Sequence, residues 1–309
     1  MARVVSVSLG SSKRDKATDV TLLGVPFRIE RIGTDGDRNR FRSLMLELDG
    51  TVDAIGIGGA DMWLRVGDRK YAFREIVELT SGVKHSILVD GSGLKHTLER
   101  RAIEILGRGV LDWSQEKALL VSGVDRFGMA EALAKACPRV VYGDILFGLG
   151  LPIPVRRFST FQLLASLLLP VVTQLPFQWF YPTGAKQDTR SPKFPRYFDE
   201  ATVICGDWHY VRRYAPDKMP GKTIVTQTLR AADLEWLATT GVKRVVATTP
   251  VVEGETFATN VMEGVVLSLL GKRPDEASEA DYLHILDNLQ WQPTVIEPRV
   301  TSPDPVQSA

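Results

Sequence analysis

Short apolar runs and helical patterns alternate along most of the chain. Phe41, Leu44, Met45 and Leu48 fall at i, i+3, i+4 and i+7, which predicts a helix with one buried face. Short apolar stretches predict buried strands at 4–9, 27–32, 52–57, 86–90, 117–122, 139–142, 201–205, 223–226 and 244–250. Nearly continuous apolar strands that alternate with helices are typical of parallel sheets. The sequence therefore predicts an α/β fold with a doubly wound parallel sheet.

Length and composition narrow the class of protein. A chain of 309 residues with 44% hydrophobic and 24% charged side chains is not disordered. Its length suggests two domains, with one large α/β domain as the alternative. The 38 basic and 37 acidic residues give a net charge of +1, far from the dense positive field of a nucleic-acid-binding protein. We therefore expect a small-molecule partner.

The cysteines and the N-terminus bear on the compartment. Cys137 and Cys205 are far apart in apolar settings, which argues against a disulfide framework and a thiolate zinc site. No metal is expected. The N-terminus lacks the long apolar run of a signal peptide. We expect a cytoplasmic protein.

Residues 158–185 contain no charged side chain, which raises the question of a membrane span. Pro170 and Pro176 argue against one, because each removes a backbone hydrogen-bond donor and the glutamines of the segment would need partners in lipid. We expect a core helix at 160–169, a packed apolar connection after it, and no integral membrane span. An element that covers the substrate is the next alternative, and a membrane contact is the least favoured.

Two glycine-containing turns in the first third are candidate substrate sites. The turn at 33–37 holds Thr34 and Asp35 and precedes a helix. Its amides suit a polar group while its carboxylates oppose a phosphate, which favours a polyol or sugar-like ligand. The alternative is that the acid only caps the helix. Asp61 follows two glycines at the end of a strand, where open α/β sheets bind ligands, unless the glycines only form a tight turn.

Asp90 and Lys95 are the strongest catalytic candidates. Asp90 ends the strand at 86–90, a Gly-Ser-Gly turn follows, and Lys95 lies at the start of a helix. A carboxylate that orients a lysine in a partly closed cleft lets the lysine exchange a proton with a hydroxyl, because burial can lower the lysine pKa. In the alternative interpretation, Asp90 caps the helix and Lys95 is solvated.

Residues 117–144 have the order of a dinucleotide-binding βαβ unit. A strand runs into a turn from Gly123 to Gly128, a helix follows, and Asp144 comes 21 positions after Gly123. Gly123, Asp125, Gly128 and Asp144 are therefore candidate cofactor-binding residues. The carboxylate of Asp144 favours NAD, with NADP left open. The turn reads GxxxxG and not GxGxxG, so a βαβ unit without a nucleotide is the alternative.

Two further candidates concern the substrate. Asp207 and His209 follow the strand at 201–205, and two positions apart on an extended chain they would contact one ligand. A paired surface histidine is the alternative. Lys186 is the first charge after the uncharged segment and would suit an anionic substrate group.

Six segments carry a resemblance to a known family. They are RIGTDGD, DAIGIGG, VDGSGLKHTLER, YGDILFGLGLP, YPTGAKQ and GDWHYVRRY. Together they resemble bacterial proteins labelled quinate 5-dehydrogenase, over residues 4–289. The architecture also resembles shikimate dehydrogenases, although the motifs SxSxxxHN, NVTxPxK and GxGGxxxA of those enzymes are not intact in this sequence.

The resemblance implies a division of the chain and an activity. The expected parts are a substrate-binding domain at 1–110, a Rossmann-like nucleotide-binding domain at 111–272, a helix at 273–293 that packs back on the first domain, and a flexible tail at 294–309. The implied reaction is NAD(P)-linked oxidation of a cyclic polyol carboxylate such as quinate or shikimate. Thr249 lies in ATTP, which resembles the NATP segment of these enzymes, and is a cofactor-binding candidate. A homodimer is left open.

Two functions are consistent with these sequence features. The first is this dehydrogenase, with Lys95 and Asp90 as the proton-transfer pair. The second is a non-catalytic two-domain protein that binds a nucleotide or a polyol. A third reading is a peripheral membrane enzyme that uses residues 158–185.

Overall fold

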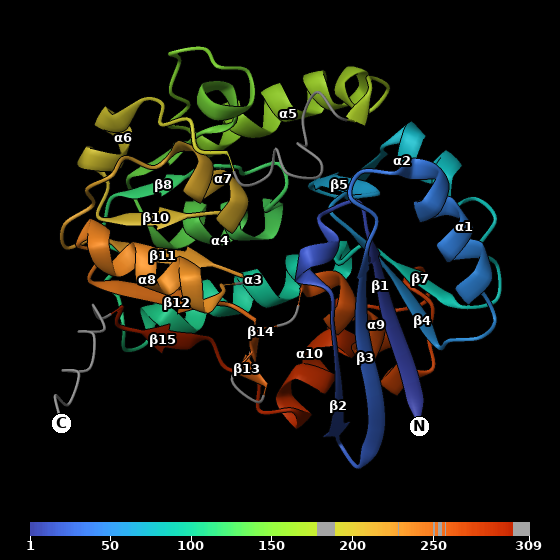
Figure 1. The fold of residues 1–309 in the computed structure, drawn as a ribbon. Coiled ribbons are helices and arrows are strands. Elements are labelled where there is room, and N and C mark those ends of the chain that lie inside the picture. Colours follow the sequence, from blue (N-terminus) through green and yellow to red (C-terminus); the bar gives the residue numbers. More distant parts are fainter. Residues whose placement is uncertain (178–188, 228, 250, 253–254, 257, 299–309) are drawn as a thin grey trace, which may run out of the picture.

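The computed structural model describes residues 1–177, 189–227, 229–249, 251–252, 255–256 and 258–298. Two sheets form the centres of two lobes that lie side by side, the first built mainly from the N-terminal third of the chain (Figure 1). Both sheets are mainly parallel and carry helices on both faces. The predicted α/β fold with a doubly wound parallel sheet is confirmed.

The first lobe is built on a five-stranded sheet. In spatial order its strands are β2 (Lys16–Leu22), β3 (Val25–Gly33), β1 (Ala2–Ser8), β4 (Ala54–Gly58) and β7 (Ile87–Val89). Only β2 is antiparallel to its neighbour. Because side chains alternate along a strand, Val5 and Val7 pack against the helices α1 (Arg38–Leu48) and α2 (Arg74–Thr80), whereas Val4 faces the other side. That other side is covered by α3 (Ser92–Gly107), α9 (Thr259–Leu270) and α10 (Glu279–Asn288).

The second lobe is built on a six-stranded sheet. In spatial order its strands are β15 (Thr294–Ile296), β12 (Arg244–Ala247), β11 (Thr223–Thr226), β10 (Val203–Cys205), β8 (Ala118–Leu120) and β9 (Val140–Tyr142). Its helices are α4 (Phe127–Ala136), α5 (Phe158–Val172), α6 (Pro195–Glu200), α7 (Trp208–Tyr214) and α8 (Ala231–Thr240). From β8 the chain continues to β9, which lies on one side of β8. The next strand of the sheet in the chain, β10, lies on the other side of β8. The strand order therefore reverses between β8 and β10, where doubly wound sheets form a ligand crevice.

Smaller elements complete the chain. They are the 3-10 turn η1 (Ser12–Arg14), the π-helical turn η2 (Asp144–Gly148), the hairpin of β5 (Trp63–Val66) and β6 (Arg69–Ala72), and the hairpin of β13 (Val251–Val252) and β14 (Glu255–Thr256). No helix in the described part of the chain is long and apolar enough to cross a membrane.

The chain passes between the lobes three times, and this changes the expected domain boundaries. Residues 259–270 were expected in the second domain, but as α9 they pack on β1, β4 and β7 of the first lobe. Gly264 makes this possible, because a Cβ there would lie 2.8 Å from a methyl group of Val4. Residues 294–296 were expected in a flexible tail, but as β15 they pair with β12. The helix α10 packs on α3 and α9.

A buried glutamate joins α9 to the start of α3. Glu263 accepts hydrogen bonds from the amides of Gly91 at 2.7 Å and Leu94 at 3.1 Å, and from the hydroxyl of Tyr282 at 2.9 Å. Burial raises the pKa of Glu263 to about 7. Backbone amides at a helix N-terminus have no partner within the helix, so this carboxyl takes the place of a local cap. The first turn of α3, which carries Lys95, is thereby held in place.

Candidate functional site

Residues that follow the carboxyl ends of strands from both sheets meet between the lobes. Asp61 follows β4, Asp125 follows β8 and Asp207 follows β10. The helix α3 brings Lys95 between the first two: its Nζ lies 2.5 Å from Asp61 and 3.1 Å from Asp125. The side chains of Lys95, Asp61 and Asp125 are 12%, 9% and 6% exposed. A buried ion-pair cluster thus joins the two lobes.

Arg126 extends this cluster. Its guanidinium pairs with Glu99 of α3, lies 3.2 Å from Asp125 and lies 2.8 Å from Asp207. The side chain of Arg126 is 2% exposed. Gln227, which follows β11, donates to Asp207 at 2.5 Å. Bidentate and multiple charged hydrogen bonds of this kind fix geometry as well as charge.

The charges within the cluster and its burial shift the pKa values of its side chains. Burial alone would lower the pKa of Lys95, but the carboxylates of Asp125 and Asp61 outweigh it and hold that pKa above its usual range. Burial and the charge of Asp125 raise the pKa of Asp61 well above its usual value. Burial opposes ionisation of Asp125 as well, yet Lys95 and Arg126 lower its pKa. Asp125 is therefore the more acidic member of the carboxyl pair.

The expected pairing of Lys95 with Asp90 is not what the structure shows. The carboxylate of Asp90 accepts the amides of Met62 and Trp63, both at 2.8 Å, and of Ser92 at 2.9 Å. It fixes the turn after β4 and the start of α3, while Lys95 pairs with other carboxylates. A lysine that exchanges protons near neutral pH needs a lowered pKa, and the pKa of Lys95 is raised.

Asp207 and His209 lie on a helix and not on a strand, because β10 ends at Cys205 and Gly206 turns the chain with φ +138°. Asp207 is the N-cap of α7 and accepts the amide of His209 at 2.8 Å. The ring of His209 lies 3.5 Å from the guanidinium of Arg14, and burial lowers its pKa. Asp207 joins the cluster through Arg126, and His209 lies at its edge.

The remaining substrate and cofactor candidates are placed as follows. Thr34 is buried and donates to the carbonyl of Ser8 at 3.1 Å, and Asp35 accepts the amide of Ser12 at 2.8 Å, so both hold the turn after β3 together. Thr249 is buried and donates to the carbonyl of Gln227. Lys186 lies outside the described residues.

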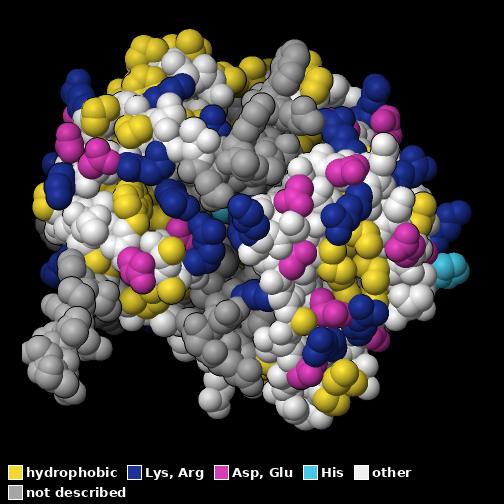
Figure 2. Space-filling view, in the orientation of Figure 1, with side chains coloured by type: hydrophobic (Ala, Val, Ile, Leu, Met, Phe, Trp, Pro, Cys, Tyr) yellow, Lys and Arg dark blue, Asp and Glu magenta, His cyan; other side chains and the backbone are white. Residues whose placement is uncertain are grey.

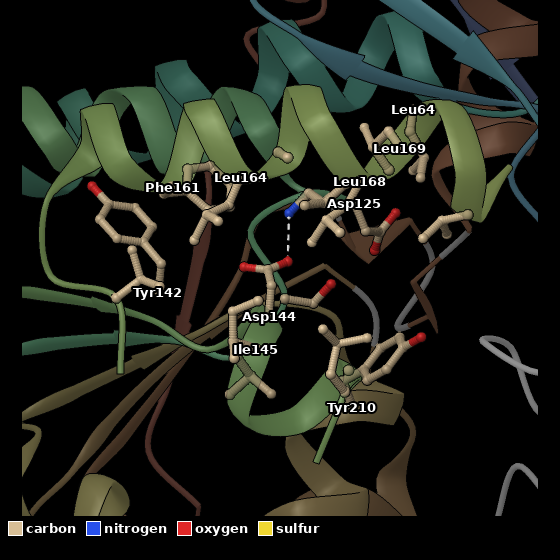
Figure 3. A pocket seen from close by; sticks show the side chains of 18 of the residues that line it. Leu64, Asp125, Tyr142, Asp144, Ile145, Phe161, Leu164, Leu168, Leu169 and Tyr210 are labelled. Atoms are coloured by element: carbon tan, nitrogen blue, oxygen red, sulfur yellow. Dashed lines mark hydrogen bonds between the residues drawn. The ribbon is translucent and has the colours of Figure 1, made fainter. Parts of the chain in front are cut away.

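A pocket lies at the strand ends of the second lobe, next to the cluster. Its volume is about 120 Å³, and its walls are mainly aliphatic and aromatic. Polar groups enter it from the ends of three strands: Ser122 and Asp125 after β8, Asp144 after β9, and Tyr210 on α7. Figure 3 shows Asp144 and Tyr210 below the pocket and the side chains of α5 above it. The apolar lining residues include Leu64, Phe73, Phe161, Leu164, Leu168 and Leu169.

The helix α5 is the roof of this pocket and spans both lobes. At its start, Phe161 stacks on Tyr142 of the second lobe with ring centres 4.8 Å apart. Past its end, the carbonyl of Thr173 accepts the amide of Arg74 at 3.1 Å, and Phe177 meets Phe73 of the first lobe edge to face at 5.5 Å. The expected core helix is thus buried on one face only, and that face covers a cavity.

Asp144 is an acid of the pocket whose pKa is raised. Its two carboxyl oxygens accept the amide of Gly123 at 3.0 and 3.1 Å, and one of them also accepts the amide of Val124 at 2.9 Å. Burial raises the pKa of Asp144 to about 6, against these hydrogen bonds. The carboxyl therefore changes charge close to neutral pH.

The turn after β8 does not fit a dinucleotide. The amides of Gly123 and Val124, which would hold a pyrophosphate, are bonded to Asp144. A Cβ at Gly123 would lie 2.9 Å from the ring of Phe161, so α5 covers the turn. A Cβ at Gly128 would lie 2.4 Å from the carbonyl oxygen of His96, so this glycine serves the close packing of α4 on α3.

Several residues of the site were missed by the sequence reasoning. Arg126 and Gln227 link the cluster across the second lobe, and Ser122 and Tyr210 line the pocket. Glu99 had a detectable signal, since it lies four positions after Lys95 on the same helix face. Among the described residues, no group of three or more histidine, cysteine, aspartate or glutamate side chains is arranged to hold a metal ion.

Comparison with known proteins gives structural likenesses at low identity. Among curated proteins, none matches the chain. A glutamate dehydrogenase from Thermus thermophilus is 14% identical, with 94% of this chain and 74% of that chain covered and a TM-score of 0.44. The arabinose binding protein AraP from Geobacillus stearothermophilus is 11% identical, with 96% and 97% covered and a TM-score of 0.39. A sugar transport substrate-binding protein from Bordetella parapertussis is 10% identical, with 98% and 92% covered and a TM-score of 0.34. At these values we infer no ligand from them.

Two family models match the sequence itself. Residues 3–90 match the model described as domain of unknown function DUF8753, which corresponds to most of the first lobe before α3. Residues 93–298 match the model described as domain of unknown function DUF8754, from α3 through the second lobe and on to the last described strand. Since this second match covers more than half of the chain, the protein belongs to the family of domain of unknown function DUF8754.

Proposed function

We propose that this protein binds one small ring-shaped molecule beneath α5, and that the molecule carries a hydroxyl or amino group that donates to Asp144. The observation that carries the proposal is the pocket of about 120 Å³ at the ends of β8, β9 and β10. This is the point where the strand order of the second sheet reverses, and open α/β sheets bind ligands there. An apolar pocket with a few convergent polar groups is the usual form of such a site.

The size and lining of the pocket indicate the ligand. An apolar cavity of about 150 Å³ admits benzene, so this smaller pocket of about 120 Å³ has room for one six-membered ring at most, with any substituent directed to its polar end. The aliphatic and aromatic walls favour an uncharged ring. The polar end offers Asp144, with its raised pKa, and the ionised Asp125. A carboxylate ligand such as quinate would meet these acids, whereas a hydroxyl or ammonium group would donate to them.

The buried cluster supports the binding role by holding the lobes together. Lys95 and Glu99 on α3 pair with Asp125 and Arg126 beside the pocket. These contacts fix the turn after β8, which forms one wall. A pre-formed wall lowers the ordering cost of binding. The cluster thus supports the pocket, and a lysine with a raised pKa is poorly suited to exchanging protons near neutral pH.

The test is calorimetric titration with cyclohexanol, phenol and cyclohexylamine, alongside quinate, shikimate, NAD⁺ and NADP⁺. For such small molecules we expect dissociation constants of about 1 mM for the first three. A tenfold excess over that constant would stabilise the fold by about 1.4 kcal/mol, which a thermal shift detects. Asp144→Asn should weaken cyclohexylamine at least tenfold and cyclohexanol less, because only the amine loses a charged partner.

A matched pair of variants on α5 separates the pocket from the helix surface. Leu164 lines the pocket, while its neighbour Leu163 is 59% exposed on the outer face. Leu164→Trp should fill the cavity and abolish binding, and Leu163→Trp should leave binding unchanged. Binding that survives Leu164→Trp would refute the proposal. Binding of NAD⁺ or NADP⁺ with reduction in the presence of quinate or shikimate would replace it by the dehydrogenase function.

A further inference from the structure

The outer face of α5 is apolar and exposed. Leu163, Leu167 and Val171 follow each other at four-residue intervals and are 59%, 63% and 62% exposed. Residues on the turn before α5 continue this surface: Leu149, Leu151 and Ile153 are 46%, 46% and 56% exposed. Figure 2 shows hydrophobic side chains gathered along the edge of the molecule where Figure 1 places α5. We call these six side chains the α5 surface.

This surface is unusual for a helix at the outside of a protein. The inner face of α5 already buries Phe161, Ala165 and Leu169 in the core and the pocket roof. A surface helix normally has polar residues opposite its buried stripe, and a helix that is apolar all round is covered on both sides. Exposed apolar patches of this kind mark sites of protein or membrane interaction.

The charges around the surface indicate what covers it. The chain has no acidic residue from 145 to 187, whereas Arg156 and Arg157 stand exposed at the start of α5. Neither arginine forms an ion pair with a described residue, and Glu200 of α6, on whose pKa the charge of Arg156 acts, is paired with Arg196. Cations at a helix N-terminus are opposed by the helix dipole, so their position does not serve the helix itself. An anionic partner would use them.

We infer that the α5 surface lies on a lipid membrane that contains anionic lipids, with α5 parallel to the membrane plane. Leucine and valine side chains would enter the interface, and the two arginines would contact lipid phosphates. A second copy of the chain fits less well. A two-fold contact would place the same patch on both sides, and residues 145–187 supply no carboxylate to pair with Arg156 or Arg157.

The helix does not cross the membrane in this arrangement. It has 15 residues and includes Pro170, whereas a span needs about 20 apolar residues. Amphipathic contact by one helix face is sufficient for interfacial binding, and it depends on both apolar area and attraction to anionic lipid. Binding should therefore weaken with salt and with neutral lipid.

The experiment is flotation of the full chain with vesicles of phosphatidylcholine alone or of phosphatidylcholine mixed with the anionic lipid phosphatidylglycerol. The wild type should float with the anionic vesicles. Arg156→Gln with Arg157→Gln should lower the partition coefficient about 30-fold, which corresponds to about 1 kcal/mol for each cation. Leu163→Glu with Leu167→Glu should abolish flotation. Leu46→Glu on α1, at a leucine that is 47% exposed, is the matched control and should float like the wild type.

Three results would overturn the inference. In the first, the wild type binds neither kind of vesicle. In the second, the variant with Leu163→Glu and Leu167→Glu floats as well as the Leu46→Glu control. In the third, the wild type binds no vesicle, and light scattering shows a dimer that the Leu163→Glu and Leu167→Glu variant dissociates, so that the surface is a contact between copies. Circular dichroism of each variant establishes that it is folded. Since ligand titration in solution needs no vesicles, failure here leaves the proposed function open to its own test.

Discussion

Replacing Arg126 by methionine tests whether the cluster between the lobes is a buried ion-pair network. The guanidinium is 2% exposed and pairs with three carboxylates, those of Glu99, Asp125 and Asp207. Methionine keeps much of the unbranched stem but carries no charge. After the change, Asp125 retains Lys95 and Asp207 retains Gln227. Among the described residues, the second carboxyl oxygen of Glu99 has no hydrogen-bond partner, so the change leaves this buried carboxylate without its ion pair.

The size of the stability loss follows from the carboxylate of Glu99, which loses its charged partner. Removing one partner of a buried pair costs about 3–5 kcal/mol, because the other charge stays desolvated. Burial already raises the pKa of Glu99 in the wild type, and losing Arg126 raises it further. A raised folded-state pKa contributes stability below the unfolded pKa of about 4.5, and this contribution is lost as the pH rises through the folded-state value. The deficit of Arg126→Met should therefore be larger at pH 8 than at pH 5.

The assay is urea unfolding of the wild type and variants between pH 5 and pH 8. Arg196→Met is the control, because Arg196 is 77% exposed and pairs with Glu200 at 2.6 Å on the surface. This change should alter the stability little at any pH, because solvent screens an exposed ion pair. Glu99→Gln added to Arg126→Met should recover part of the loss, by about 1–3 kcal/mol. Equal losses for Arg126→Met and Arg196→Met, or a deficit that does not change with pH, would refute the reasoning.

Two further predictions concern Asp144, which accepts the amides of the turn after β8, and Gly128 of α4. Burial raises the pKa of Asp144 to about 6, so the wild type loses stability as the pH rises from about 4 to 7. Over this range Asp144→Asn should gain up to about 3 kcal/mol of unfolding free energy relative to the wild type. Urea unfolding measures this, and the exposed control Asp217→Asn should stay within about 0.5 kcal/mol of the wild type. Gly128→Ala should cost about 1–3 kcal/mol because its methyl group meets the carbonyl of His96, whereas Gly109→Ala, with open space around it, should not; similar melting temperatures for the two would contradict the close packing of α3 and α4.

The fold could be predicted from local patterns to a large extent, because each buried strand is a short apolar run with its own boundaries. The division into lobes could not. Residues 259–270 form a strongly apolar helix that would suit either sheet, and only Gly264 reveals its close fit on Val4. The pairing of 294–296 with β12 depends on three residues at the sheet edge. Neither contact can be predicted from the sequence of its own segment, because each depends on the distant segment that it packs against.

The candidate site was predicted as separate residues and not as contacts. Asp61, Lys95, Asp125 and Asp207 were all identified from their positions at strand ends or helix starts. Lys95 was assigned to Asp90, five positions earlier, whereas its partners lie 34 positions before and 30 positions after it. Sequence spacing ranks nearby partners first, while a doubly wound sheet brings distant strand ends together. The pKa direction of the lysine was therefore predicted with the wrong sign.

Asp125 connects the two parts of the site. Its carboxylate bonds Lys95 within the cluster, and the same residue lines the pocket. Burial, with the charge of Asp125 next, raises the pKa of Tyr210, which lines the same pocket, and this keeps the phenol protonated. A ligand group that donates to Asp125 would share it with Lys95, and would weaken the hold of the lysine on the second lobe. If the proposed ligand binds beneath α5, its binding and the contact between the lobes would be coupled through this carboxylate, so that replacing Lys95 should change the ligand affinity.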